Sequence, residues 1–196
     1  MITFPSKQPF VATTIFTKMS QLASDEGALN LAQGFPSFDC SDALQDLVKF
    51  YSKGHNQYAP MAGVPVLKSS IAAKTASFYG VSLDANTEVT VVSGATEAIF
   101  ASIHCCVFPG DEVIMFDPSY DAYDPIVRLA GGTPIHIPLK ASNGYRIDWD
   151  ELARHITPKT KAIMVNSPHN PTGAIWEPGD LDAFAKVVKG TRSEEH

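Results

Sequence analysis

The sequence predicts an α/β fold in which a mostly parallel sheet is covered by helices on both faces. From residue 89 onward, short apolar or β-branched runs alternate with helical stretches, which is the pattern of βαβ units. The predicted strands are also almost continuously apolar, as in Val113–Phe116 and Ile163–Val165. Such runs are typical of parallel sheets, whose strands are buried on both faces.

The residues before position 89 are predominantly helical in pattern. Val11, Ile15, Met19 and Leu22 recur at steps of three or four and predict a helix over residues 10–24. The same periodicity predicts helices over residues 41–52 and 65–79. Gly80 is the expected cap at the end of the third helix, because glycine readily adopts the left-handed conformation there.

The residues after position 89 supply the sheet. The expected strands cover residues 89–92, 112–116, 133–137 and 162–165, and the expected helices run over about 94–107, 119–131, 149–155 and 181–188. Ligands of open α/β sheets bind outside the carboxyl ends of the strands. This rule directs attention to three loops, at residues 93–97, 117–121 and 166–173.

Composition excludes several classes of function. The chain has 196 residues, and its 15 basic and 21 acidic side chains give a net charge of −6, which is not the balance of a nucleic-acid-binding protein. We find no apolar stretch long enough to span a membrane, no signal peptide and no metal-ligand spacing. We therefore expect no nucleic acid, no membrane and no metal as partners.

Cysteine usage predicts a reducing compartment. The three cysteines are Cys40, Cys105 and Cys106, an odd number that includes two adjacent residues. Neighbouring cysteines rarely form a disulfide, so we expect buried free thiols and a cytoplasmic location. The six histidines are dispersed along the chain and are left without an assigned role.

The first loop offers a phosphate site. Gly94, Ala95 and Thr96 follow a predicted strand and open a helix. Small residues allow a ligand to approach the backbone, and the helix N-terminus provides unpaired N–H groups and a positive dipole end. The alternative is that Ser93 or Thr96 only caps the helix. The glycine fingerprints of P-loop and dinucleotide-binding proteins are absent.

The second and third loops carry groups that suit a flat ligand. Tyr120 and Tyr123 follow a strand, where a ring could stack on a heterocycle, although both could instead pack on a helix face. In the third loop, two X-Pro bonds, either of which can be cis, stiffen the backbone around Asn170, so that its amide could be held against a ligand oxygen.

Five segments together resemble the class I and II pyridoxal-phosphate aminotransferases of fold type I. In chain order they read LAQGFP, QYAPMAGVPVLKSSIA, VVSGATEAIF, FPGDEVIMFDPSYDAY and NSPHNPTG. The resemblance is strongest to the branch of methionine, kynurenine and glutamine transaminases, and it extends to about Gly190. It implies the N-terminal half of a three-layer α/β/α large domain, with an N-terminal segment of the small domain.

The resemblance assigns cofactor-binding roles to five residues. Ala95 and Thr96 occupy the positions that bind the phosphate of pyridoxal 5'-phosphate, and Tyr120 occupies the position that stacks on the pyridine ring. Asn170 corresponds to the amide that donates to the phenolic oxygen of the ring. Tyr58 corresponds to the tyrosine that reaches the phosphate held by the other subunit of a homodimer.

The resemblance also assigns substrate contacts and domain boundaries. Gly34 matches a backbone contact to the substrate carboxylate, and Asn166 a substrate-side amide. Residues 1–45 would belong with the small domain, residues 46–190 with the large domain, and residues 191–196 form an atypical tail. The family's strand order is 3-2-4-5-6-7-1, in which residues 89–92, 112–116, 133–137 and 162–165 are strands one to four.

No catalytic residue of the family is found in this chain. The Schiff-base lysine, the carboxylate that pairs with the ring nitrogen and the substrate-binding arginine all follow the NPTG segment in the family. We therefore expect the N-terminal half of a longer protein, inactive by itself. Removal of strands five to seven would leave the first strand unpartnered and the fourth with an open edge.

The expected activity is transfer of an amino group between an amino acid and a 2-oxo acid. Methionine or aromatic amino acids are the expected donors, with glutamine as a further one, in a cytoplasmic homodimer. A carbon–sulfur β-lyase shares these early motifs and is an alternative. A second alternative is an inactive fragment or binding module that keeps only the phosphate contacts. A nucleotide-binding α/β domain is disfavoured by the missing glycine fingerprints.

Overall fold

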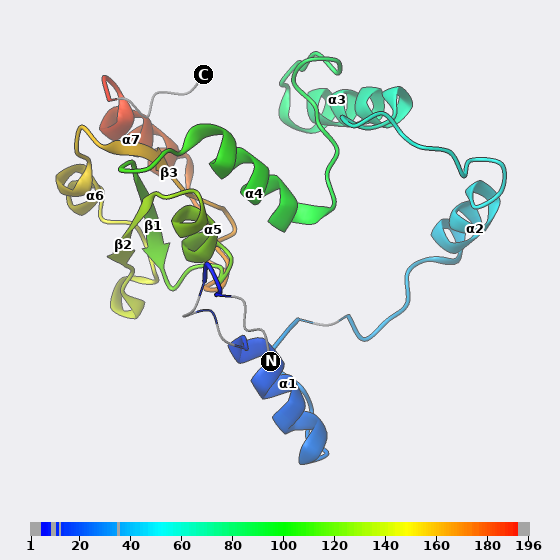
Figure 1. Cartoon of the computed structure of the whole chain (residues 1–196), viewed down its shortest axis with the longest axis horizontal. Coiled ribbons are helices and arrows are strands. Elements are labelled where there is room, and N and C mark those ends of the chain that lie inside the picture. Colours follow the sequence, from blue (N-terminus) through cyan, green and yellow to red (C-terminus); the bar gives the residue numbers. More distant parts are fainter. Residues whose placement is uncertain (1–4, 9–10, 12, 35, 192–196) are drawn as a thin grey trace. The chain divides into compact units, whose positions relative to one another are not determined.

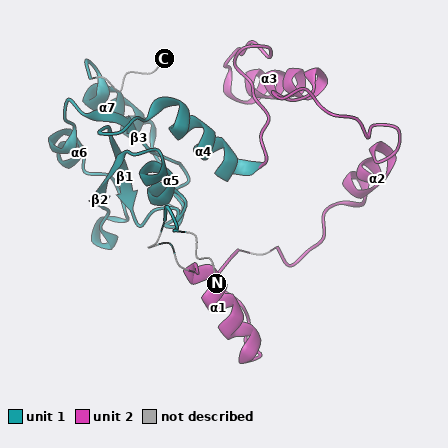
Figure 2. Ribbon diagram, viewed as in Figure 1, with its two compact units in different colours: residues 1–12, 94–196 teal, residues 13–93 magenta. Residues whose placement is uncertain are grey.

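The computed structural model describes residues 5–8, 11, 13–34 and 36–191. The chain divides into two compact units (Figure 2), residues 1–12 with 94–196 and residues 13–93. We call them unit 1 and unit 2 and describe each by itself. The predicted division at residues 45 and 190 into parts of a small and a large domain stays a prediction. Residues 192–196 of the predicted tail lie outside the described residues.

Unit 1 alternates helices and strands along the chain (Figure 1). Its elements are α4 (Gly94–Cys106), β1 (Glu112–Asp117), α5 (Tyr123–Leu129), β2 (Thr133–Pro138), a 3-10 turn (Ala141–Asn143), α6 (Trp149–His155), β3 (Thr160–Ile163) and α7 (Pro178–Val188). This confirms the predicted α/β alternation.

The three strands form a parallel sheet in the order β2-β1-β3. In register, Ile114 of β1 lies opposite Ile135 of β2 and Ile163 of β3. The order confirms the neighbours that the family resemblance implies for these strands. Met164 N donates to Ile114 O at 2.8 Å, so the pairing of β3 with β1 continues one residue beyond the strand.

β1 is the centre of two hydrophobic cores. Val113 and Met115 point to one face, where they pack against Ile103 of α4 and Val127 of α5. The intervening side chains point to the other face and pack with residues of β2, α6 and α7 (Ile114, Phe116, Ile137, Leu152, Phe184 and Val187). All four inner residues of β1 are at most 3% exposed. The helices therefore cover both faces of the sheet, and unit 1 has the predicted three layers.

The described residues of unit 2 form the helices α1 (Ile15–Asp25), α2 (Asp42–Tyr51) and α3 (Pro65–Tyr79). Thr14 caps α1 by accepting a hydrogen bond from Thr17 N at 3.3 Å. Pro65 begins α3 and Gly80 ends it at φ 69°, as the sequence predicts. Phe10 and Ala12, within the predicted first helix, lie outside the described residues.

The predicted strand at residues 89–92 is wrong. These residues have no regular secondary structure, although Val89 is buried. Val91 N donates to Ala62 O at 3.0 Å, which is a contact with a turn and not a ladder. A β-branched run forms a strand only when a second strand satisfies its backbone groups, and no described strand pairs with this one.

Several predicted boundaries move by a few residues. α5 begins at Tyr123 instead of near Ser119, because the residues before it form a turn in which Tyr123 N donates to Tyr120 O at 3.1 Å. α7 begins at Pro178, where Asp180 accepts a hydrogen bond from Glu177 N at 2.8 Å. β3 covers residues 160–163 instead of 162–165.

The predicted burial of the thiols is also wrong. Cys40, Cys105 and Cys106 are free and exposed. Cys105 and Cys106 lie at the end of α4, a helix that packs against the core through Ile99 and Ile103 instead.

We predict that Leu152→Ala destabilises the chain by about 2–5 kcal/mol, because Leu152 is fully buried in the core on the α6 side of β1 and its truncation leaves a cavity. The matched control is Leu181→Ala on α7, where the leucine is 58% exposed and the expected change is within about 0.5 kcal/mol. Urea unfolding followed by circular dichroism measures both. Equal losses from the two variants would show that this core does not hold unit 1 together.

Candidate functional site

The candidate site lies at the carboxyl edge of the sheet in unit 1. β1 and β3 are parallel, so the loops that follow them, residues 118–122 and 164–177, leave the sheet at the same edge. They include most of the second loop predicted from the sequence, residues 117–121, and all of the third, residues 166–173. The parallel pairing therefore brings two segments that are about fifty residues apart in sequence to one rim.

The N-terminus of α4 joins this rim through a hydrogen bond. The hydroxyl groups of Thr96 and Tyr120 are 3.1 Å apart, and either can donate. α4 is 13 residues long and opens at Gly94, whose φ of 84° suits glycine. Ala95 and Thr96 are exposed there. The structure thus brings together the helix N-terminus predicted to hold a phosphate and the tyrosine predicted to stack on a ring.

The two tyrosines of the second loop have different roles. The rings of Tyr120 and Tyr123 meet edge to face, with centroids 5.6 Å apart. Tyr123 begins α5 and packs against the core on the α4 side, where burial and then the neighbouring Tyr120 raise the pKa of its phenol. The packing alternative therefore applies to Tyr123. Tyr120 precedes the helix and is held from two sides, by the Tyr123 ring and the Thr96 hydroxyl.

The third loop is folded by its own hydrogen bonds. His169 N donates to Ala174 O at 2.8 Å and Gly173 N donates to His169 O at 2.7 Å. The His169 Nδ1 atom lies 2.8 Å from Thr172 Oγ1, and burial lowers the pKa of this imidazole. The Ser167-Pro168 and Asn170-Pro171 bonds are cis, as is Asp117-Pro118 in the second loop.

The two asparagines of the third loop differ in their surroundings. Asn166 Nδ2 donates to Pro168 O at 3.2 Å, and Asn166 lines a cavity of about 10 Å³ with Tyr145 and Trp176. That volume is near the minimum for one water molecule, so the cavity cannot hold a cofactor. Asn170 lies exposed in the loop. Its amide is therefore accessible, whereas that of Asn166 is bonded within the loop.

Two predicted site residues, Gly34 and Tyr58, belong to unit 2. Gly34 is exposed, and a Cβ atom there would meet nothing within 4 Å. Tyr58 is fully exposed, in a segment without regular secondary structure. Both are accessible for the contacts that the sequence predicts.

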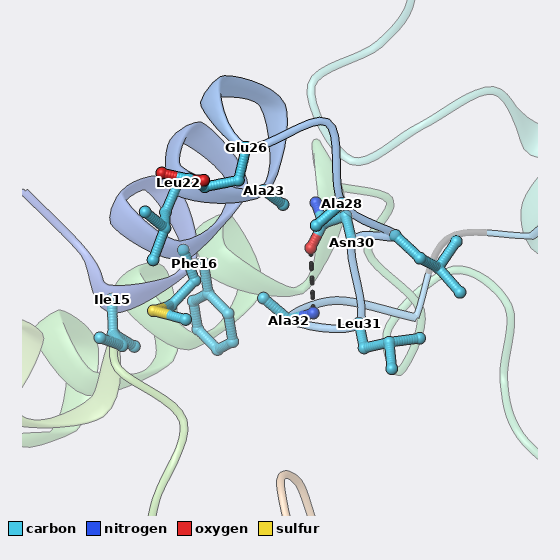
Figure 3. A pocket seen from close by; sticks show the side chains of 11 residues that line it. Ile15, Phe16, Leu22, Ala23, Glu26, Ala28, Asn30, Leu31 and Ala32 are labelled. Carbon is cyan, nitrogen blue, oxygen red and sulfur yellow. Dashed lines mark hydrogen bonds between the residues drawn. The ribbon is translucent and has the colours of Figure 1, made fainter.

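One apolar pocket of unit 2 is a poor candidate for a phosphorylated ligand. It measures about 700 Å³ and is formed by α1 and residues 28–32 (Figure 3). Its lining is apolar apart from Glu26 and Asn30, and Asn30 Oδ1 already accepts a hydrogen bond from Ala32 N at 3.0 Å. It contains no cationic side chain, and Glu26 would repel an anion.

Two other kinds of site are missing from the described part of the chain. No group of three or more histidine, cysteine, aspartate or glutamate side chains there could hold a metal ion. None of the helices there has the length and apolar character that a membrane span requires.

One cluster was missed by the sequence reasoning, which left the histidines unassigned. His136 of β2 contacts Asp117 at the end of β1 and Asp124 in the first turn of α5. No local motif links these three positions. In the register of β1 and β2, His136 lies opposite Met115, two residues before Asp117, so the side chains of His136 and Asp117 are diagonal neighbours on one face of the sheet.

Fold and site together define a class of protein. A three-layer α/β unit in which a helix N-terminus and a tyrosine meet at the carboxyl edge of a parallel sheet is suited to a phosphorylated, flat cofactor. The sequence matches the aminotransferase class I and II family over residues 26–192. The chain belongs to this family, as its motifs predict.

The relatives support the predicted branch of the family. The chain is 45% identical to a methionine aminotransferase from Escherichia coli over 94% of its own length and 48% of the relative's. It is 34% identical to human kynurenine–oxoglutarate transaminase 3, over 89% of this chain and 41% of that protein. The chain therefore spans about half the length of the curated relatives it matches.

Solved structures agree with the fold. The crystal structure of the E. coli methionine aminotransferase matches with a TM-score of 0.93 and 43% identity, over 98% of this chain and 50% of that one. The N-succinyldiaminopimelate aminotransferase of Mycobacterium tuberculosis matches with a TM-score of 0.87 and 42% identity, over 95% and 49%. These matches confirm that the fold is that of aminotransferases.

We predict that Gly94→Ala destabilises the chain by about 1–2 kcal/mol, because its φ of 84° is costly for a residue with a side chain. Gly179→Ala is the matched control: it also lies in the first turn of a helix with nothing within 4 Å of the added Cβ, but its φ is not positive. We expect that control to be neutral or slightly stabilising. Thermal unfolding compares the two, and equal effects would rule out backbone strain as the reason for glycine at the start of α4.

Proposed function

We propose that this chain supplies the phosphate and ring contacts of a pyridoxal-phosphate-dependent aminotransferase. The observation that carries the proposal is the hydrogen bond between Thr96 at the N-terminus of α4 and Tyr120 in the loop after β1. Family membership and the donor chemistry of this rim support the same ligand. The residues fit the cofactor: N–H groups and a hydroxyl for the phosphate, and an aromatic face for the ring.

Different residues of the chain would contact different parts of the ligand. The first amides of α4, including those of Ala95 and Thr96, would bind the phosphate together with the Thr96 hydroxyl. Tyr120 would orient the ring by stacking, and the exposed Asn170 amide would donate to the ring's phenolic oxygen. When bound, pyridoxal 5'-phosphate supplies an electron sink for chemistry at the amino acid's α-carbon.

The proposed reaction moves an amino group between an amino acid and a 2-oxo acid. The names of the relatives, which include methionine and kynurenine aminotransferases, support methionine or aromatic donors. We propose Gly34 N–H as a contact for the substrate carboxylate and Asn166 as a substrate-side amide. Pyruvate and ammonia release from cystathionine without transamination, by the protein that contains this chain, would favour a carbon–sulfur β-lyase instead.

A cytoplasmic homodimer is part of the proposal. Three free cysteines support a reducing compartment. Many large apolar side chains of unit 2 are exposed, among them Leu44, Leu47 and Phe50 of α2, and burial against a second copy would remove them from water. The fully exposed Tyr58 ring supports a contact that another subunit completes.

The test of phosphate binding uses pyridoxamine 5'-phosphate, whose amine does not condense with lysine side chains. We expect the 196-residue chain to bind it more tightly than pyridoxamine, and Thr96→Val to weaken binding at least about tenfold, since a hydrogen bond to a charged group is worth about 1.5–3 kcal/mol. Thr133→Val, at the amino end of β2 and thus the opposite edge of the sheet, is the control. Equilibrium dialysis that finds no preference for the phosphorylated form would refute the proposal.

The cross-subunit role of Tyr58 has its own test. In the homodimer, we predict that Tyr58→Phe speeds release of pyridoxamine 5'-phosphate roughly tenfold, because one hydroxyl contact to the phosphate is lost. Tyr79→Phe, at the exposed end of α3, should leave the release rate unchanged. Stopped-flow dilution measures both rates. Unchanged release from the Tyr58 variant would mean that this tyrosine does not reach the phosphate.

A further inference from the structure

His136 lies between two carboxylates. Its Nδ1 atom is 2.9 Å from Asp117 Oδ2, and its Nε2 atom is 3.0 Å from Asp124 Oδ2. An ionised carboxylate only accepts hydrogen bonds, so both ring nitrogens must donate for both contacts to be hydrogen bonds. Only the doubly protonated, positively charged imidazolium can do this. The geometry is therefore that of a charged histidine.

The two carboxylates stand at the two ends of the loop that carries Tyr120. Asp117 is the last residue of β1 and Asp124 the second residue of α5, with residues 118–122 between them. His136 comes from the neighbouring strand and bonds both. A single side chain of β2 thus ties the end of β1 to the start of α5.

The anchors of this link are themselves held. Arg128 binds Asp124 through two hydrogen bonds, Nε to Oδ1 at 2.7 Å and Nη2 to Oδ2 at 3.0 Å. The backbone of Asp117 accepts a hydrogen bond from Leu139 N at 2.7 Å. Arg128 therefore holds the Asp124 carboxylate independently of His136, and Leu139 holds the backbone of Asp117, whereas the link between the two carboxylates depends on His136.

The charges around His136 favour its protonated form. Burial lowers the pKa of His136, but the hydrogen bonds to Asp117 and Asp124 outweigh it and raise the pKa above its usual value. Arg128, the fourth charged group of the cluster, lowers the pKa of Asp124 and keeps that carboxylate ionised. α6 also contacts β2, but it packs on the opposite face, through Leu152 against Ile137.

We propose that His136 is a positioning residue whose imidazolium clamps both ends of loop 118–122 and so holds the Tyr120 ring in place beside Thr96. Loss of the ring proton removes one of the two bonds and loosens the loop. The identity of the ligand that Tyr120 contacts rests on the proposed function, whereas the clamp rests only on the contacts of His136.

The clamp has a pH dependence of definite sign. Because the pKa of His136 is raised in the folded chain, its stabilisation is complete below the unfolded pKa of about 6.5 and is lost as pH rises through the higher folded value. The folded loop is therefore held more firmly at pH 6 than at pH 9. Burial raises the pKa of Tyr123, so the ionisation of this phenol lies above most of this range.

Two measurements on the 196-residue chain test the clamp. In nitrogen-15 NMR of the histidine rings, we expect both nitrogens of His136 to carry protons at pH 6 and the ring to titrate above about 6.5. Unfolding experiments give the folding equilibrium constant of the wild type and of His136→Gln. We expect the ratio of the two constants, wild type over variant, to be at least about threefold larger at pH 6 than at pH 9. His104→Gln, which replaces an exposed histidine of α4, is the control, and the same change of ratio for that variant as for His136→Gln would count against the clamp.

Binding separates this inference from the proposed function. We compare the dissociation constants of pyridoxamine 5'-phosphate for His136→Gln and for the wild type. Titration of the ligand affects both constants equally and cancels in their ratio. We expect this ratio, variant over wild type, to fall toward one as pH rises. If the wild type binds no ligand, the proposed function fails while the NMR and unfolding profiles still decide the clamp.

If His136→Gln does not fold, Asp124→Asn, which should lower the His136 pKa, replaces it. A His136 that titrates at or below 6.5 with one protonated nitrogen would overturn the inference.

Discussion

The burial of β1 between two hydrophobic cores is the constraint on which the rest of unit 1 depends. Its four inner side chains are sealed on both faces, and both of its edges are paired, with β2 and β3. A strand enclosed in this way cannot slip by one residue without moving apolar side chains to the wrong core. The position of Asp117 at its end is therefore fixed, and with it the point at which the Tyr120 loop leaves the sheet.

The site assembles from this fixed edge because different elements contribute one feature each. α4 provides a helix N-terminus, the loop after β1 provides an aromatic face, and the loop after β3 provides an exposed amide at Asn170. Each feature by itself is ordinary in α/β proteins. Their combination is specific because the Thr96 and Tyr120 hydroxyls meet at 3.1 Å across 24 positions of sequence.

The features that the sequence predicted depend on local residues, whereas the features that it missed depend on which elements pack together. Strand 112–116 was predictable from its own residues, since continuous apolar character indicates burial on both faces, whereas the order of the strands followed from the family resemblance. The run at residues 89–92 has the same character, but a strand also needs a partner, which local sequence does not report. The exposure of Cys105 and the contacts of His136 likewise depend on which elements pack together, so neither composition nor spacing could reveal them.

The side chains proposed to contact the ligand differ in how much conformational freedom they lose on binding, and this loss reduces the affinity that each can contribute. Thr96 and Tyr120 already contact each other, and the Tyr120 ring packs edge to face against the half-buried Tyr123. These side chains therefore lose little conformational freedom when a ligand binds. Tyr58 is fully exposed, so its side chain loses rotational freedom when it contacts a ligand. We therefore expect unit 1 to supply most of the affinity for the phosphate and ring. We expect a contact from Tyr58 to act mainly on the residence time of the ligand, because most effects of single contacts on affinity lie in the dissociation rate.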